Sequence, residues 1–333
     1  MHRAPRPLAA LCLAAALATL AACTASPGAP GAPGSAPKSA SGTRTVETAM
    51  GDVTVPAVPR RVVVLDTAGL DSALALGVTP VGATHGDAPS GFPRYLPAAR
   101  LTGVQDLGES MNPDLKAVAA LRPDLILAGK VRHEDTYAEL RAIAPTVMTD
   151  DSGDSWKDGF QIHAAALGRE REAARTVAAY TAHAARVTES LGGTAAAART
   201  KVSVIRFVEG ADIRIQGRRT SLGVVLADVG LGRPPVTARA ANGFSYDIGP
   251  ARIALAGAGA SVLFHSTYGD PAAAGRTRTL ASPAWRALPP VRAGRAFPVD
   301  DEVWVRSPGY LAADRVLTEL QQHLTTRQAP GGG

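Results

Sequence analysis

The stretch GREREAARTVAAYTAHAARVTESLG, residues 168–192, decides the fold because it predicts one long helix near the middle of the chain. Its apolar residues recur every three or four positions and so form one stripe of an α-helix; they are Ala173, Val177, Tyr180, Ala184, Val187 and Leu191. Charged residues fill the other faces. Gly192 ends the helix, since glycine accepts the left-handed conformation of a C-cap. We expect a helix roughly 35 Å long, at about 1.5 Å per residue.

Similar patterns of buried strands and helices lie on both sides of this helix. Before it come RVVVLDTAGLDSALALGVTPVGAT (61–84) and LKAVAALRPDLILAG (115–129). After it come KVSVIRF (201–207), LGVVLADVGLGRP (222–234) and ARIALAGAGASVLFHS (251–266). Continuous apolar runs alternating with helices are typical of parallel sheets covered on both faces. The sequence therefore predicts two Rossmann-like α/β lobes joined by a single helix; one large α/β domain with an ordinary surface helix is the alternative.

These patterns also give the expected boundaries. The first lobe is expected at 44–167, the connecting helix at 168–192 and the second lobe at 193–325. Residues 84–112 are rich in Gly, Pro and Asp and are expected to be irregular. The loop at 129–133 follows a buried strand, and open α/β sheets bind ligands at that end of their strands.

The first 23 residues, MHRAPRPLAALCLAAALATLAAC, have the features of an export signal. Two arginines precede an apolar run from Leu8 to Leu20, which is shorter than the roughly 20 residues that span a membrane. The ending Leu20-Ala21-Ala22-Cys23 resembles a bacterial lipobox. That resemblance implies removal of 1–22, a lipid on Cys23, and a location on the extracytoplasmic face of the cell membrane. An ordinary signal peptide is the alternative.

The segments at the two ends are low in complexity. Residues 23–43 are almost entirely Pro, Gly, Ala and Ser after the cysteine, a composition that predicts a disordered tether. The tail 326–333 is expected to be disordered as well. A lipid and a tether together would hold a domain close to a membrane surface without inserting it.

Charge and cysteine content exclude several classes of function. The formal charge of +6 falls to +4 once the signal segment leaves, and no basic run carries interleaved aromatics, so no nucleic-acid partner is expected. One cysteine remains after cleavage, which rules out an intramolecular disulfide. No HxxxH or CxxC spacing predicts a metal site, and no GxSxG predicts a hydrolase. We expect a binding protein without catalytic residues or a cofactor, and a monomer.

The runs PRRVVVLD, ALGVTPVGAT and LRPDLIL in the first half, with KVSVIRF, IRIQG and VWVRSPGYLAADRVLTEL in the second, carry a family resemblance. Together they resemble the iron–siderophore and cobalamin class of ABC-transporter solute-binding proteins, over residues 45–322. The resemblance implies two lobes bridged by one helix (class III), a ligand between them, and an ABC transporter permease as partner. The VIRF strand and the last-loop tryptophan resemble binders of ferric hydroxamate siderophores.

The resemblance and the expected loops together suggest the ligand-binding residues. Arg206 in VSVIRF and Trp304 in the last loop match ligand-contacting positions of the family. Guanidinium groups suit the anionic oxygens around the metal, and aromatic rings suit the apolar periphery of a siderophore. The weaker candidates share a place in a loop expected to reach the cleft: Arg306, Arg132, His133, Tyr246 and Tyr268, with Arg218-Arg219 as a further pair. Trp156 is expected at the junction of the lobes.

Two positions depart from the family pattern. Family members carry one surface glutamate on each lobe for docking onto the permease, and here Lys116 and Ala251 occupy those places. Docking would then use Asp114, Glu109 or Asp247, or the partner is different. The open alternatives are a carrier of another chelate such as cobalamin or haem, and a sensor or scavenger lipoprotein without a transporter.

Overall fold

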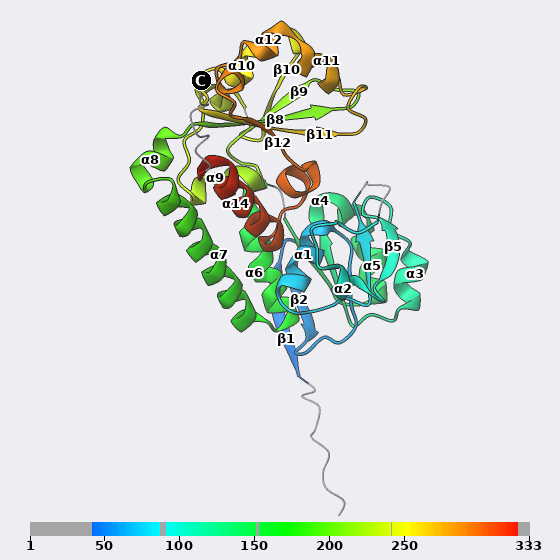
Figure 1. Ribbon diagram of the computed structural model, residues 1–333. Helices are drawn as coiled ribbons and strands as arrows, with labels where there is room; N and C mark the ends of the chain where they lie inside the picture. Colours follow the sequence, from blue (N-terminus) through cyan, green and yellow to red (C-terminus); the bar gives the residue numbers. More distant parts are fainter. Residues whose placement is uncertain (1–41, 87–90, 151–152, 241, 326–333) are drawn as a thin grey trace, which may run out of the picture. The chain divides into compact units, whose positions relative to one another are not determined.

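The computed structural model describes residues 42–86, 91–150, 153–240 and 242–325. Two five-stranded sheets and one hairpin make up its β-structure (Figure 1). The expected signal segment, Cys23, the tether up to residue 41 and the tail 326–333 lie outside the described residues. Among the described residues, no helix combines the length and the apolar character needed to cross a membrane.

The first lobe is built on a parallel sheet with the strand order β5-β4-β3-β6-β7. Its strands are β3 (Val62–Val64), β4 (Gly82–His85), β5 (Gln105–Glu109), β6 (Leu125–Gly129) and β7 (Thr146–Thr149); β1 (Thr43–Thr48) and β2 (Gly51–Pro56) form an antiparallel hairpin. Val62 and Val64 face one hydrophobic core and Val63 faces another. This alternation explains why the strand is apolar throughout.

Short helices connect these strands: α1 (Thr67–Ala75), α2 (Ala98–Leu101), α3 (Leu115–Ala120), α4 (Lys130–His133), η1 (Glu134–Thr136), α5 (Tyr137–Ile143), η2 (Gly153–Ser155) and α6 (Trp156–Leu167). The expectation that 84–112 is irregular was wrong, because this region contains α2 and β5. Only Leu107 of β5 is buried, so the strand shows no apolar alternation. The expected loop at 129–133 is largely the helix α4.

The second lobe carries a mixed sheet with the order β10-β9-β8-β11-β12, in which β8, β11 and β12 are parallel. Its strands are β8 (Val202–Val208), β9 (Ile213–Gln216), β10 (Ser245–Ile248), β11 (Val262–Tyr268) and β12 (Ala296–Pro298). Its helices are α8 (Thr194–Arg199), α9 (Ser221–Asp228), η3 (Pro235–Arg239), η4 (Pro250–Arg252), α10 (Ala254–Gly257), α11 (Arg276–Ala281), α12 (Pro283–Arg286), α13 (Pro289–Arg292), the π-helical turn η5 (Glu302–Arg306) and α14 (Tyr310–Thr325).

The long helix α7 (Glu170–Ser190) links the two sheets. Of the six residues in its expected apolar stripe, Ala173, Tyr180, Ala184 and Val187 are buried, and the other two pack partly buried against the same core. The residue after its C-cap, Gly192, has φ +93°, the left-handed conformation expected of it.

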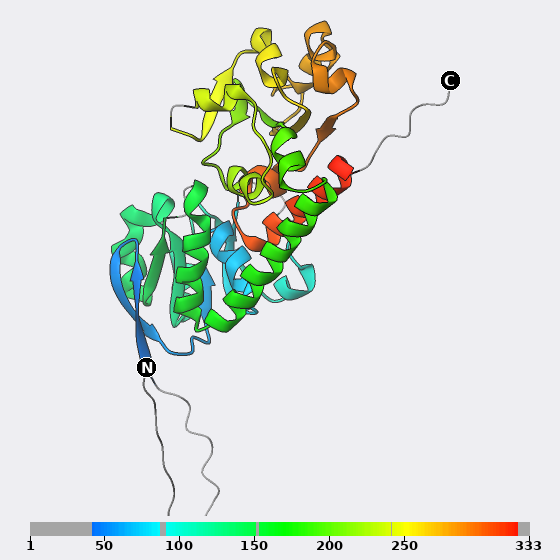
Figure 2. The same ribbon diagram turned by 90° about the vertical axis from the view of Figure 1, so that its left-hand side faces the viewer.

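Aromatic packing joins the lobes beside α7. The ring of Tyr310 at the start of α14 lies 4.8 Å from that of Trp156, 4.6 Å from Phe160 and 5.2 Å from Tyr180. These rings come from α14, α6 and α7, and α14 runs alongside α7 (Figure 2). The expectation that Trp156 packs at the lobe junction is confirmed.

A buried carboxylate adds a polar contact at this junction. Asp71 of α1 accepts hydrogen bonds from the backbone N–H groups of Leu311 and Ala312, at 3.0 and 3.1 Å, and from the Tyr95 hydroxyl at 3.1 Å. It therefore caps the first turn of α14 from a helix 240 residues earlier in the chain. A side chain at Gly309 would overlap Asp71, so the close approach requires glycine.

Candidate functional site

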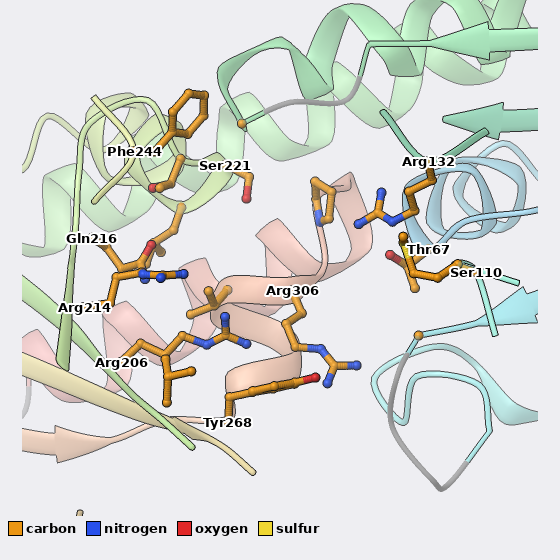
Figure 3. Close-up of a pocket in the computed structure, with 18 residues that line it drawn as sticks. Thr67, Ser110, Arg132, Arg206, Arg214, Gln216, Ser221, Phe244, Tyr268 and Arg306 are labelled. Atoms are coloured by element: carbon orange, nitrogen blue, oxygen red, sulfur yellow. The ribbon is translucent and has the colours of Figure 1, made fainter. Parts of the chain in front are cut away.

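A cavity of about 560 Å³ lies where the carboxyl ends of strands from both sheets meet, a volume within the range of small-molecule sites. From the first lobe it is lined by Thr67 after β3, Gly86 after β4, Ser110 after β5 and Arg132 in α4. From the second lobe come Arg206, Arg214, Gln216 and Tyr268, with Arg306 from the η5 turn (Figure 3). This is the end of the strands where α/β sheets bind ligands.

Arg206 is held rigidly in the wall of the cavity. Its Nε and Nη2 donate to the two carboxylate oxygens of Asp301 at 2.7 and 2.6 Å. Ser266 donates a further hydrogen bond to Asp301 at 2.8 Å. The two partners of this bidentate pair are only 13% and 9% exposed. Asp301 thus fixes the guanidinium and balances its charge.

Arg306 reaches the cavity in a different environment. Its guanidinium carbon lies 5.4 Å from the centre of the Tyr268 ring, and that of Arg206 lies 4.7 Å from the same ring. The Arg306 side chain also approaches Gly86, where an added Cβ would come within 2.8 Å of Arg306 Nη2. Glycine at this position therefore leaves room for the arginine. Two cations share one aromatic ring, which orients both toward the cavity.

Arg214 and Gln216 sit on β9 two residues apart, so their side chains share one face of the strand. Arg214 pairs with Asp247 of the neighbouring β10, at 3.1 and 3.3 Å. A buried fifth arginine, Arg233, donates to the backbone oxygen of Gln216. Burial lowers its pKa to about 10.

A second set of contacts closes one rim of the cavity. Arg219 pairs with Asp154 at 2.8 and 3.2 Å and lies over the ring of Phe244, 5.3 Å from its centre. Gly153 lines the cavity here, and a side chain on it would overlap both the Phe244 ring and the Arg219 carbonyl. Both residues of the Arg218-Arg219 pair expected beside the cleft are exposed, and Arg219 is bonded across the rim.

Of the residues suggested by the sequence, the structure brings four to the cavity: Arg132, Arg206, Tyr268 and Arg306. It places three elsewhere. Trp304 is 1% exposed; its indole donates to Glu319 at 2.6 Å and its ring packs 4.6 Å from Phe264. We therefore leave Trp304 out of the proposed site.

His133 and Tyr246 also lie away from the cavity lining. The two ring nitrogens of the buried His133 lie 3.1 Å from the Gly129 carbonyl oxygen and 2.8 Å from that of Ser110. Tyr246 lies on β10 beside Arg239, whose hydrogen bond lowers the pKa of the tyrosine hydroxyl. We leave both residues out of the proposed site.

Sequence reasoning missed several lining residues: Thr67, Ser110, Met111, Arg214, Gln216, Ser221 and Phe244. The alternation in IRIQG, residues 213–217, was the available signal for Arg214 and Gln216, since alternate residues of a strand share a face. No comparable pattern marks Ser110 or Phe244, because each enters from a connection whose path depends on the fold.

The expected docking acids have structural partners. Asp114 is the N-cap of α3 and accepts from the backbone N–H groups of Lys116 and Ala117, both at 3.0 Å. Asp247 pairs with Arg214 and remains 42% exposed. Lys116 and Ala251, at the positions where the family resemblance led us to expect glutamates, are exposed. Within the described residues, no cluster of three or more His, Cys, Asp or Glu side chains could hold a metal ion.

Known proteins share this architecture along most of the chain. The structure of SirA from Staphylococcus aureus, complexed with staphyloferrin B, superposes with a TM-score of 0.75 and 27% identity, covering 86% of this chain and 100% of that one. The probable siderophore-binding lipoprotein YfiY of Bacillus subtilis is 32% identical over 86% of this chain and 89% of its own length. The Fe(3+) dicitrate-binding periplasmic protein FecB of Escherichia coli is 28% identical over 83% and 88%.

The solved structure shares the class III arrangement seen here, two α/β lobes joined by one helix, and the named relatives are binding proteins, not enzymes. The family model described as periplasmic binding protein matches residues 62–303, from the first buried strand to the η5 turn beside the cavity. Because that match spans both sheets, the connecting helix and most of the cavity lining, the chain belongs to the periplasmic binding protein family.

Proposed function

We propose that this protein captures a ferric siderophore outside the cytoplasmic membrane and delivers it to an ABC importer. The observation that carries the proposal is the arginine-lined cavity between the carboxyl ends of two sheets. The proteins to which this chain is similar support the same ligand class, since their names give a siderophore and ferric dicitrate as ligands.

The cavity would hold the chelate by its oxygen atoms. Arginine side chains donate to the anionic oxygens around the iron, while Tyr268, Phe244 and Leu222 cover apolar parts of the ligand. The siderophore supplies all the iron ligands in this mechanism. The ferric complex is the transported cargo, so no cofactor is needed.

The lobes would move little when the ligand binds. A single continuous helix and the Trp156–Tyr310 aromatic cluster connect them, and packed rings resist large rotations. X-ray scattering with and without ligand would show a nearly constant radius of gyration. A compaction of several ångströms would contradict this part of the proposal.

The proposed location is the outer face of the membrane, with the chain anchored by a lipid on Cys23. The sequence before Cys23 and the lipoprotein names of relatives support this anchor. Cys23→Ser should release the protein from membranes into the soluble fraction. Retention of the variant in the membrane fraction would refute lipidation at this residue.

The proposed permease contacts use Asp114 on one lobe and Asp247 on the other, with Glu109 as a further acid on the first lobe. Lys116 and Ala251 take the usual glutamate positions, and these features favour a sensor or scavenger as the second candidate function. Iron uptake by cells carrying Asp114→Asn would separate the two. Undiminished uptake would remove Asp114 from docking.

Equilibrium binding to purified protein tests the main proposal. The chain has three buried tryptophans, Trp156, Trp285 and Trp304, and we expect a bound ferric chelate to quench their fluorescence. We expect at least one ferric siderophore to bind with a dissociation constant below about 1 μM, equivalent to about 8 kcal/mol. Haem and cobalamin, the alternative chelates, should bind much more weakly. Binding of haem or cobalamin alone, with no ferric chelate bound, would overturn the proposal.

A further inference from the structure

The described part of the cavity lining carries charges of one sign only. Among the described residues that line it, every charged side chain is an arginine: Arg132, Arg206, Arg214 and Arg306. They come from both lobes and point into the space between them (Figure 3). A ligand seated there meets guanidinium groups from opposite sides.

Only two of these arginines have a carboxylate partner among the described residues. Asp301 pairs with Arg206, and Asp247 pairs with Arg214. No described carboxylate lies within 4.0 Å of the guanidinium of Arg132 or Arg306. The described lining therefore keeps two positive charges without an ion-pair partner.

Buried Arg233 adds positive charge behind the cavity wall. It is 7% exposed, and two of its guanidinium nitrogens, Nε and Nη1, have no hydrogen-bond partner within the part of the chain that the structure describes. Its bonded nitrogen, Nη2, contacts the backbone of Gln216, a lining residue. A buried charge without a counter-ion acts over a longer distance than an exposed one, because water screens it less.

The choice of ligand follows from what happens when water leaves the cavity. A neutral ferric trihydroxamate would displace water from Arg132 and Arg306 and supply no counter-charge, which costs free energy. A multiply charged anion would replace the water with charge-assisted hydrogen bonds. We infer that the ligand is a multiply anionic ferric chelate with carboxylate or catecholate oxygens, not a neutral trihydroxamate. This inference rests on the proposed function and replaces the hydroxamate expected from the sequence.

The Tyr268 ring holds two of the guanidinium groups in position for such a ligand. The guanidinium groups of Arg206 and Arg306 both lie over its ring, so the ring electrons hold both cations in place. Arg306 is thus oriented without an acidic partner from the described residues that would neutralise it. Its charge remains available to the ligand.

Three probes with different charges test the inference: ferric dicitrate, an anionic ferric tris-catecholate, and a neutral ferric trihydroxamate. We expect at least one anionic chelate to bind about 10-fold or more tightly than the trihydroxamate. Its affinity should fall as the salt concentration rises, while that of the neutral complex stays nearly constant. The two anionic probes show whether carboxylate or catecholate oxygens are preferred.

Paired variants test the charge itself. Arg306→Gln should weaken the anionic chelate roughly 10- to 100-fold, as expected for loss of a hydrogen bond to a charged group. Asp247→Asn releases Arg214 from its partner and should strengthen binding about threefold. Arg186→Gln and Glu189→Gln make the same charge changes on the exposed face of α7 and should leave the affinity unchanged.

The outcomes separate the two proposals. A trihydroxamate that binds as tightly as the anions, with Arg306→Gln lacking any effect on them, would overturn the inference and leave the proposed function standing. Binding of no ferric chelate at all would remove the proposed function itself. Tight binding of an anionic chelate, weakened by Arg306→Gln and strengthened by Asp247→Asn, would support both the proposed function and the inference about the charge of the ligand.

Discussion

Asp71 offers a test of how the two lobes are joined, through the pH dependence of stability. Its carboxylate is fully buried and bonded to the first turn of α14 and to Tyr95. Burial raises its pKa from 3.8 to about 6, and the hydrogen bonds only partly oppose that rise. Between pH 4 and 6, Asp71 is therefore largely protonated in the native protein but largely ionised in the unfolded chain.

The sign of the effect follows from linkage. A pKa that is higher in the folded state stabilises the protein below the unfolded pKa, and this contribution is lost as the pH rises through 6. From pH 4.5 to 7.5 the loss for Asp71 should be about 2 kcal/mol, since each pKa unit corresponds to about 1.4 kcal/mol. Asp71→Asn cannot titrate and should lack this component.

Urea unfolding of both proteins between pH 4.5 and 7.5 measures the difference. The stability of the natural protein relative to Asp71→Asn should decrease by about 2 kcal/mol over this range. Asp135→Asn, an exposed control on η1, should show no such change. A constant difference between natural protein and Asp71→Asn would refute the assignment of a raised pKa to this buried cap.

Three further substitutions test other parts of the structure. His163 is buried, and burial lowers its pKa to about 4, so the stability that it contributes is lost as the pH falls from 6.5 to 4. His163→Phe should therefore remove up to about 3 kcal/mol of the loss of stability in acid, as measured by urea unfolding. Trp304→Phe should cost about 2 kcal/mol or more of stability, because the indole packs on Phe264, yet leave chelate affinity unchanged in calorimetric titration. Gly86→Ala should displace the Arg306 guanidinium and weaken chelate binding about fivefold with little loss of melting temperature; an unchanged dissociation constant would contradict the expectation that Gly86 makes room for a ligand-binding position of Arg306.

The sequence was sufficient to predict the strands that are buried on both faces and the helix that has a regular apolar stripe. Val62–Val64 and Leu125–Leu127 are buried, as are four of the six residues in the α7 stripe, and their hydrophobic periodicity reflects that directly. The strand β5 was missed because it buries only Leu107. An edge strand with polar neighbours on both faces leaves no periodic signal.

The site was less predictable than the fold, because it depends on which side chains turn toward the cavity. The family resemblance suggested both Arg206 and Trp304, yet only Arg206 lines the cavity, while Trp304 turns into the core against Phe264. Whether an arginine is already paired depends on residues far away in the sequence: Arg206 and its partner Asp301 are 95 residues apart. No local pattern carries that information.

The most direct measurement locates the iron. Crystals grown with a ferric chelate that binds in solution would give an anomalous signal from the metal. We expect a single strong iron peak in the cavity lined by Arg132, Arg206, Arg214 and Arg306, with ligand oxygens between the iron and the guanidinium groups. An iron peak outside this cavity, or one coordinated directly by protein side chains, would contradict it.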